Sequence, residues 1–185
     1  MKDIFLARTL ICIAFLFSHS VIADDANLEY KIKAGYLYNF TKFITWPAIN
    51  GATFNLCLLG DDPFASDIDA IEKKSAFEHP IEVLRLRETD FLSGSSMKTD
   101  CHILYVSASI DLTIVFAKIQ TSPDKAKILV VGEGENFATE GGMIGFVNRN
   151  GKIKLQINLH SVKQTGLKIS AKLLEIAELI KEDKP

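Results

Sequence analysis

The feature that most constrains the fold of this chain is an alternation of short apolar runs with amphipathic stretches. The apolar runs have the length of β-strands and occupy residues 53–59, 81–86, 102–106 and 127–131. Between them, helices are predicted over residues 63–74 and 111–120, and a short helix with a loop over residues 88–98. Strands that alternate with helices form a parallel sheet with covering helices. The sequence therefore predicts an α/β fold with a largely parallel, doubly wound sheet and helices on both faces.

The pattern changes after the fourth strand. Two alternating runs, at residues 143–147 and 152–159, flank a segment that ends in an Asn-Gly pair, which is typical of tight hairpin turns. A final helix is predicted over residues 161–181 because apolar residues recur there with helical spacing. Its apolar stripe consists of Ile169, Leu173, Ile176, Ala177 and Ile180. We therefore expect one domain over residues 24–185 that ends in an antiparallel hairpin and a helix.

The N-terminus is typical of a secretory signal peptide. A basic start is followed by an uninterrupted apolar run of eight residues at 10–17, and small or aliphatic residues lead up to Ala23. A membrane-spanning helix needs roughly 20 apolar residues, so cleavage after Ala23 is favoured over the alternative of an uncleaved anchor. Residues 1–23 are therefore predicted to be removed, and the mature domain is expected to work outside the cytoplasm.

A helix rich in aromatic residues is predicted over residues 28–45, ending before Pro47 because proline disfavours helix in the preceding residue. It carries two apolar stripes, whereas a surface helix needs only one. The first stripe contains Tyr30, Ala34, Leu37, Tyr38, Thr41 and Ile44. The second contains Tyr36, Phe40 and Phe43, with Trp46 just beyond. Either the helix is buried on both sides, or the second stripe meets a partner, since aromatic residues dominate interfaces.

No arrangement typical of catalysis occurs in the sequence. Nucleophile-elbow, metalloprotease and P-loop motifs are missing. His79, His102 and His160 have no neighbours at metal-ligand spacing, and a zinc site needs several converging ligands. His102 adjoins Cys101, but adjacent residues on a strand point to opposite faces. We therefore expect no catalytic residue, metal or cofactor.

Two further classes of ligand are disfavoured. The formal net charge of −2 argues against nucleic acid, which needs a basic face. The glycines at 132 and 134 follow a strand but lack the third glycine of a dinucleotide site, and Glu133 and Glu135 would repel a phosphate. This segment is predicted to be a turn.

Asp61 and Asp62 follow the first strand, at the carboxyl end where open α/β sheets bind ligands. They are the candidate residues of a ligand pocket. The structural alternative is that Asp62 caps a helix whose first position is Pro63, while Asp61 is a solvated turn residue.

Cys57 and Cys101 remain after removal of the predicted signal peptide. In an oxidising compartment an even pair favours a disulfide, and closing a loop of this length stabilises by about 4 kcal/mol. Sequence spacing does not decide between that bond and two buried thiols.

Four blocks of the sequence, in order, resemble the YfiR family. They are residues 30–47 (YKIKAGYLYNFTKFITWP), 54–64 (FNLCLLGDDPF), 101–107 (CHILYVS) and 141–180, which begins GGMIGFVNRNGKIKLQINL. The resemblance covers nearly all of the predicted mature chain. It implies a small periplasmic α/β protein without enzymatic activity.

The resemblance also implies partners. The family's named member represses an inner-membrane diguanylate cyclase by binding its periplasmic sensor region, and an OmpA-like outer-membrane lipoprotein can sequester that repressor. Cyclic-di-GMP output, and with it biofilm formation and motility, follows from this balance. The family is also known to dimerise.

Cys57 and Cys101 fall where the family's long-range disulfide lies, so the resemblance implies that bond. In a strand order of 2-1-3-4, the first and third strands are neighbours, which places both cysteines on adjacent strands. The family's second, short-range cysteine pair has no counterpart within residues 132–142. A redox switch that relies on that second pair is therefore not expected.

The leading hypothesis is a periplasmic, non-enzymatic protein that represses an inner-membrane diguanylate cyclase by direct contact. An OmpA-like lipoprotein and a second copy of the chain are further candidate partners. The aromatic residues Tyr36, Phe40, Phe43 and Trp46 are the candidate interface. The alternative is a periplasmic protein that binds a small ligand at Asp61 and Asp62, and an unrecognised enzyme is a third.

Overall fold

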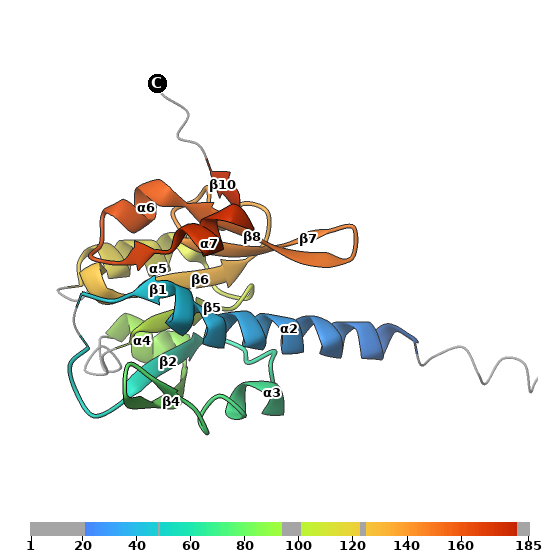
Figure 1. Ribbon diagram of the computed structural model, residues 1–185, viewed down its shortest axis with the longest axis horizontal. Coiled ribbons are helices and arrows are strands. Elements are labelled where there is room, and N and C mark those ends of the chain that lie inside the picture. The colour runs from blue at the N-terminus through green and yellow to red at the C-terminus, as the bar shows by residue number, and fades with distance from the viewer. Residues whose placement is uncertain (1–20, 48, 94–100, 123–124, 181–185) are drawn as a thin grey trace, which may run out of the picture.

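The main sheet of the protein has eight strands. The computed structural model describes residues 21–47, 49–93, 101–122 and 125–180. In chain order the strands of the main sheet are β2 (Phe54–Leu59), β3 (Ser75–Ala76), β4 (His79–Leu86), β5 (Ile103–Val106), β6 (Leu129–Glu133), β7 (Ile144–Arg149), β8 (Lys152–Asn158) and β10 (Glu178–Ile180). In space they follow the order β10-β8-β7-β6-β5-β2-β4-β3 (Figure 1). A separate small sheet pairs β1 (Ile44–Thr45) with β9 (Lys168–Ile169).

The centre of the main sheet is parallel and buried. Strands β4, β2, β5, β6 and β7 run parallel to one another. Every residue of β2 and β5 is buried, because helices cover both faces of the sheet. Strands buried on both faces are expected to be nearly continuous apolar runs, as these two are. The predicted α/β fold is confirmed, and so is the 2-1-3-4 order of the first four predicted strands, which are β2, β4, β5 and β6.

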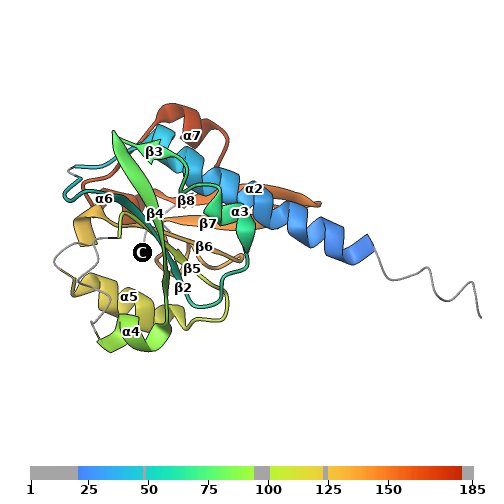
Figure 2. The same ribbon diagram turned by 90° about the horizontal axis from the view of Figure 1, so that it is seen from below.

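Helices cover both faces of this sheet. Helix α2 (Val21–Phe43) and α7 (Ala171–Glu175) lie on one face, and α4 (Glu88–Ser93) and α5 (Leu112–Gln120) lie on the other (Figure 2). The described residues also form α3 (Ser66–Asp69), α6 (Leu159–Lys163) and the 3-10 helix η3 (Lys125–Lys127). Helix α5 begins as predicted, because the Asp111 carboxylate accepts a hydrogen bond from the Thr113 N–H at 2.9 Å.

The predicted hairpin is confirmed as β7 and β8. The strands are antiparallel and their last paired residues are Arg149 and Lys152. The turn therefore consists of Asn150 and Gly151, which have φ angles of 54° and 75°. An Asn-Gly pair supplies the two positive φ angles that a two-residue hairpin turn requires.

The helix predicted over residues 63–74 is wrong, since only Ser66–Asp69 is α-helical in this segment. Asp62 does not cap it. One Asp62 carboxylate oxygen accepts a hydrogen bond from the Phe64 N–H at 2.8 Å, and the other pairs with Arg85. Ala65 then has a φ angle of 49°, which breaks the helical path. The Asp62 side chain thus forms a local turn, which competes with the cap that its position suggested.

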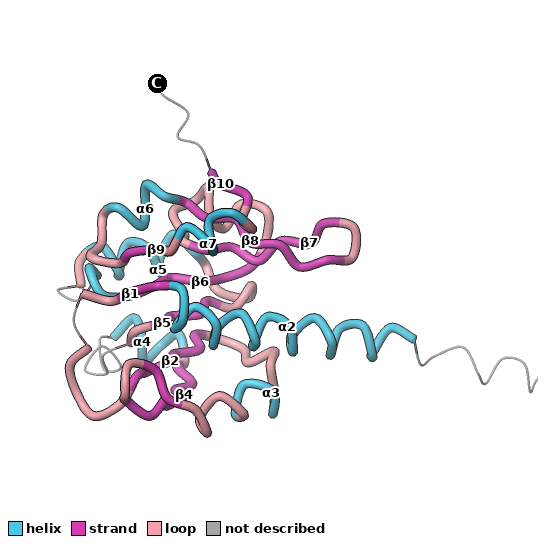
Figure 3. Tube along the Cα trace, viewed as in Figure 1, coloured by secondary structure: helices cyan, strands magenta, loops and turns pink. Residues whose placement is uncertain are grey.

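The single long helix predicted over residues 161–181 is also wrong. The chain alternates there between helix and strand, as α6, β9, α7 and β10 (Figure 3). Strand β9 pairs with β1, and β10 pairs with β8. Hydrogen bonds to distant strands therefore replace the helical ones, and the predicted stripe does not form one buried face, because Ile176 is 57% exposed.

The predicted N-terminal helix is longer at its start and shorter at its end than residues 28–45. Helix α2 ends at Phe43, because Ile44 and Thr45 pair with β9. Ala23, the predicted cleavage position, lies in the first turn of α2. The signal peptide predicted over residues 1–23 otherwise lies outside the described residues.

Candidate functional site

Helix α2 carries a lysine whose side chain is buried against the sheet. Lys33 is only 2% exposed, and it follows the same side of the helix as the buried residues Ala34 and Leu37. A buried charge is costly unless it is paired and hydrogen-bonded. Lys33 therefore requires a partner of opposite charge inside the fold.

The carboxylate of Glu133, at the end of β6, is the main partner. It forms an ion pair with Lys33 and accepts a hydrogen bond from the Tyr105 hydroxyl. The Tyr30 hydroxyl is 3.5 Å from the same carboxylate. The Lys33 ammonium lies 2.6 Å from a Glu29 oxygen and 4.4 Å from the centre of the Tyr30 ring. We call these five residues the Lys33–Glu133 cluster.

The cluster fixes the protonation of its lysine and tyrosines. Burial raises the pKa of Tyr105 far above its ordinary value, and the Glu133 charge raises it further. Burial and then Glu133 also raise the pKa of Tyr30. Burial alone would lower the pKa of Lys33, but hydrogen bonds to Glu133 and Glu29 outweigh it, so this pKa is raised. A general base or acid needs a pKa near the working pH, and these three groups are moved away from it.

A cleft of about 240 Å³ opens beside the cluster. Three parts of the chain line it: α2, the end of β6, and the β7–β8 hairpin. The lining residues are Glu29, Lys33, Glu133, Gly134, Glu135, Phe146, Val147, Asn148 and Ile153. At its rim, Arg149 pairs with Glu135 at 2.6 Å and with Glu178 at 2.9 Å. The cleft combines an apolar wall with an excess of carboxylates, so its chemistry suits a small cationic ligand with an apolar part.

The candidate pocket residues Asp61 and Asp62 do not line this cleft. Asp61 is exposed. Asp62 is held by the Phe64 N–H and by Arg85, which also pairs with Asp69 at 2.6 Å. Asp62 is therefore tied to its own turn and to Arg85 and does not form part of the cleft.

The candidate interface residues are mostly packed inside the molecule. Phe40 is fully buried and Trp46 is 5% exposed, so neither can present a contact surface, which corrects the prediction for these two. Tyr36 and Phe43 are half-buried against the core. The ring of Phe146 on β7 lies 6.0 Å from that of Tyr36 and 6.2 Å from that of Phe40. The second aromatic stripe of α2 thus faces the sheet.

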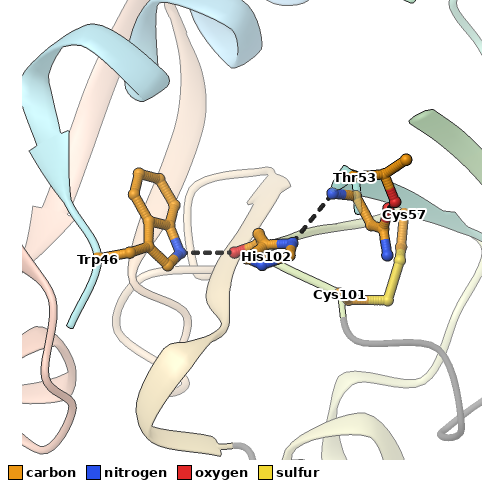
Figure 4. Close-up of a disulfide and its surroundings, with 6 residues drawn as sticks. Trp46, Thr53, Cys57, Cys101 and His102 are labelled. Atoms are coloured by element: carbon orange, nitrogen blue, oxygen red, sulfur yellow. Dashed lines mark hydrogen bonds between the residues drawn. A yellow bond between two sulfur atoms is a disulfide. The ribbon is translucent and has the colours of Figure 1, made fainter. Parts of the chain in front are cut away.

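The opposite, amino-terminal edge of the sheet holds the cysteines. Cys57 and Cys101 form a disulfide with 5.8 Å between their Cα atoms, as the family resemblance implied (Figure 4). Next to it, His102 is buried and its Nδ1 accepts a hydrogen bond from the Asn55 N–H at 3.0 Å. The Trp46 indole N–H donates to the His102 carbonyl at 3.2 Å (Figure 4). His102 therefore has a structural role.

Two negative findings apply to the described ranges only. Within residues 21–47, 49–93, 101–122 and 125–180, no three His, Cys, Asp or Glu side chains group as a metal ion would require. In the same ranges, no helix is both long and apolar enough to cross a membrane.

Sequence patterns had not identified the Lys33–Glu133 cluster. The available signal was a lysine beside Ala34 and Leu37 on a buried side of the helix, where a charge needs a partner. That partner, Glu133, is 100 residues away in the sequence, in a segment whose pattern predicts a turn, whereas the structure places it at the end of β6. Spacing alone could not join the two.

Similar folds occur among solved structures. A conserved domain protein from Vibrio cholerae O1 biovar El Tor matches with a TM-score of 0.51 and 16% identity, over 82% of this chain and 60% of that one. An ABC domain from Streptococcus pneumonia, solved in complex with L-Trp, matches with a TM-score of 0.54 and 15% identity, over 80% of this chain. The chain covers 60% of the length of each structure, and at these identities the likeness concerns the fold alone.

No curated protein sequence matches the chain significantly. A family model does match: the family DUF4154, described as YfiR/HmsC-like, aligns with residues 30–178. That range includes four of the five residues of the Lys33–Glu133 cluster, all but Glu29, and both cysteines of the disulfide. The chain belongs to the YfiR/HmsC-like family.

Proposed function

We propose that this protein is a periplasmic regulator that represses an inner-membrane diguanylate cyclase by binding the cyclase's periplasmic sensor region. Family membership over residues 30–178 is the observation that carries the proposal, because it supports a regulatory, non-catalytic role in cyclic-di-GMP signalling in general. The export signal predicted at residues 1–23 would place the domain beside the outer faces of inner-membrane sensors.

The chemistry of the site is compatible with such a role. In the Lys33–Glu133 cluster, the lysine and both tyrosines are held in their ordinary protonation states, which suits a structural tie better than proton transfer. A binding protein shifts its target only by differential affinity for the target's two states. Repression therefore requires that this protein bind the inactive form of the cyclase more tightly than the active form.

Deleting the gene and measuring cellular cyclic-di-GMP tests the proposal. Cyclic-di-GMP should rise, and return to its original level when the full chain is supplied. A chain that begins at residue 24 and stays in the cytoplasm is the control and should not restore repression. An unchanged cyclic-di-GMP level in the deletion strain would reject the proposal. In parallel, the purified mature protein should bind one member of a panel of periplasmic sensor regions from that cell's own diguanylate cyclases.

The cleft of about 240 Å³ favours a second candidate function, the binding of a small ligand beside Lys33. Its place near the carboxyl end of β6 agrees with the position of ligands in open α/β sheets. Thermal-shift measurements with amino acids and polyamines test it. L-tryptophan belongs in the panel because the similar Streptococcus domain was solved with it. A ligand of the cleft should raise Tm in the wild type but not in Phe146→Ala, and a shift retained in that variant would place the ligand elsewhere.

A further inference from the structure

One side of helix α2 has nothing packed on it in the described part of the chain. The N-terminal end of the helix extends beyond the tip of the β7–β8 hairpin in both views (Figures 1 and 2). Residues 28, 32, 35, 39 and 42 are all exposed, and their spacing places them on one side of the helix. We call this side, with the neighbouring Lys31, the outer face of α2.

The outer face begins with two apolar residues one turn apart. Leu28 is 56% exposed and Ile32 is 41% exposed. Single exposed apolar side chains are ordinary, but two on adjacent turns of a projecting helix form a patch that a partner can cover. The aromatic stripes predicted from the sequence lie on the other sides of this helix.

Gly35 continues the face, and no packing contact with the described residues accounts for a glycine at this position. Glycine is a poor residue for the interior of a helix. A Cβ atom added at Gly35 would have no atom within 4 Å, so no neighbouring group in the described chain requires its small size. A glycine does allow another backbone to approach closely. The open space at Gly35 would therefore let a partner's backbone approach the helix closely there.

The far end of the face is basic. The ammonium groups of Lys42 and Lys74 each lie 5.0 Å from the centre of the Tyr38 ring. Within the described residues, no ion pair forms at Lys31, Lys42 or Lys74. Two like charges held on one ring repel each other, and an added carboxylate would relieve that repulsion.

We propose that the outer face of α2 binds an acidic, amphipathic helix of the cyclase sensor region. The partner's backbone would approach at Gly35, its apolar residues would cover Leu28 and Ile32, and its carboxylates would pair with Lys42 and Lys74. A second copy of this chain fits less well, because the exposed positions of α2 from Asn27 to Lys42 include lysines and no carboxylate. This assignment rests on the proposed function.

The decisive variant is Gly35→Gln. Glutamine is a far better helix former than glycine, so the variant should melt about 3 °C higher than the wild type. At the same time its side chain should weaken binding of the sensor region about tenfold. Greater stability with weaker binding cannot result from misfolding. Ala117→Gln, at an exposed position of α5 on the opposite face of the sheet, is the matched control and should bind as the wild type does.

The charged end is tested by the double variant Lys42→Gln with Lys74→Gln. Its Kd for the sensor region should rise about fivefold at low salt, and binding should depend less on salt than in the wild type. If the wild type binds no sensor region, both the proposed function and this surface fail. If the wild type binds and Gly35→Gln binds equally, only the surface fails. If sedimentation experiments instead show a wild-type homodimer that dissociates in Gly35→Gln, a second copy of the chain binds the outer face of α2, and the acidic partner is rejected.

Discussion

The two edges of the parallel sheet are held together by different kinds of chemistry. At the amino-terminal edge, the Cys57–Cys101 disulfide joins β2 to the residues just before β5, and the Trp46 indole donates a neutral hydrogen bond to the His102 carbonyl. At the carboxyl-terminal edge, Lys33 and Glu133 tie α2 to β6 through buried charge. The first edge depends on oxidation and the second on protonation. Reduction and alkaline pH should therefore weaken the fold at opposite edges.

Removing the disulfide should have the largest effect. Replacing Cys57 and Cys101 with alanine frees a loop closed over 44 residues, which should lower the free energy of unfolding by about 4 kcal/mol. Urea unfolding of the wild type and the double variant measures the difference. Reductant should bring the wild type close to the double variant and leave the double variant unchanged. A loss below about 1 kcal/mol would show that the bond does not hold this edge.

Removing the Lys33 charge from the carboxyl-terminal edge should have the second largest effect on stability. Lys33→Met leaves the Glu133 carboxylate largely buried without its cation, and removing one partner of a buried pair costs about 3 kcal/mol. Lys31→Met is the control, because Lys31 is exposed on the same helix and its loss should change stability by less than about 0.5 kcal/mol. Equal stability of the two variants in urea would mean that the Lys33–Glu133 pair contributes nothing.

The variant Tyr105→Phe tests whether the loss of stability at alkaline pH arises at the carboxyl-terminal edge. The pKa of Tyr105 is raised in the folded state, so above about pH 10 the tyrosine ionises in the unfolded chain while it stays neutral in the native one. The wild type should therefore lose stability as the pH rises above about 10. The raised pKa of Lys33 acts in the same direction, since its stabilisation is complete below the unfolded pKa and is lost as the pH rises through the folded one.

At neutral pH, Tyr105→Phe should cost about 2 kcal/mol, the value of a hydrogen bond to a charged group. In alkaline solution its loss of stability with pH should be shallower than that of the wild type, with the Lys33 contribution remaining. The disulfide-free variant should keep the wild-type slope. Urea unfolding between pH 8 and about 11 distinguishes the two, and a wild-type slope in Tyr105→Phe would contradict the role of this tyrosine.

The sequence predicted the parts of the fold that local pattern determines. The buried strands β2 and β5 are continuous apolar runs, and the Asn-Gly turn fixes the β7–β8 hairpin. The C-terminal segment could not be predicted, because its apolar spacing suits a helix equally well. The segment forms strands because it pairs with β1 and β8, and these contacts lie outside the segment itself.

The candidate site was harder to predict for the same reason. The two stripes of α2 were visible in the sequence, but which side stays exposed depends on what the rest of the chain covers. Phe40 is covered by β7, whereas Leu28 and Ile32 are left outside. The disulfide was the exception, since strand order and family resemblance together placed Cys57 beside Cys101.

The smallest expected effect belongs to Glu29→Gln and defines the limit of the charged edge. Like Glu133, Glu29 pairs with Lys33, at 2.6 Å in the case of Glu29, but Glu29 is 33% exposed whereas Glu133 is 16% exposed. Water can replace the lost partner at the exposed position, so the variant should lose about 0.5 kcal/mol in urea unfolding. Glu133→Gln, which changes the buried partner in the same way, should lose several times more. Equal losses in the two variants would mean that Glu29 and Glu133 stabilise Lys33 equally, and that Glu133 is not the main partner of the cluster.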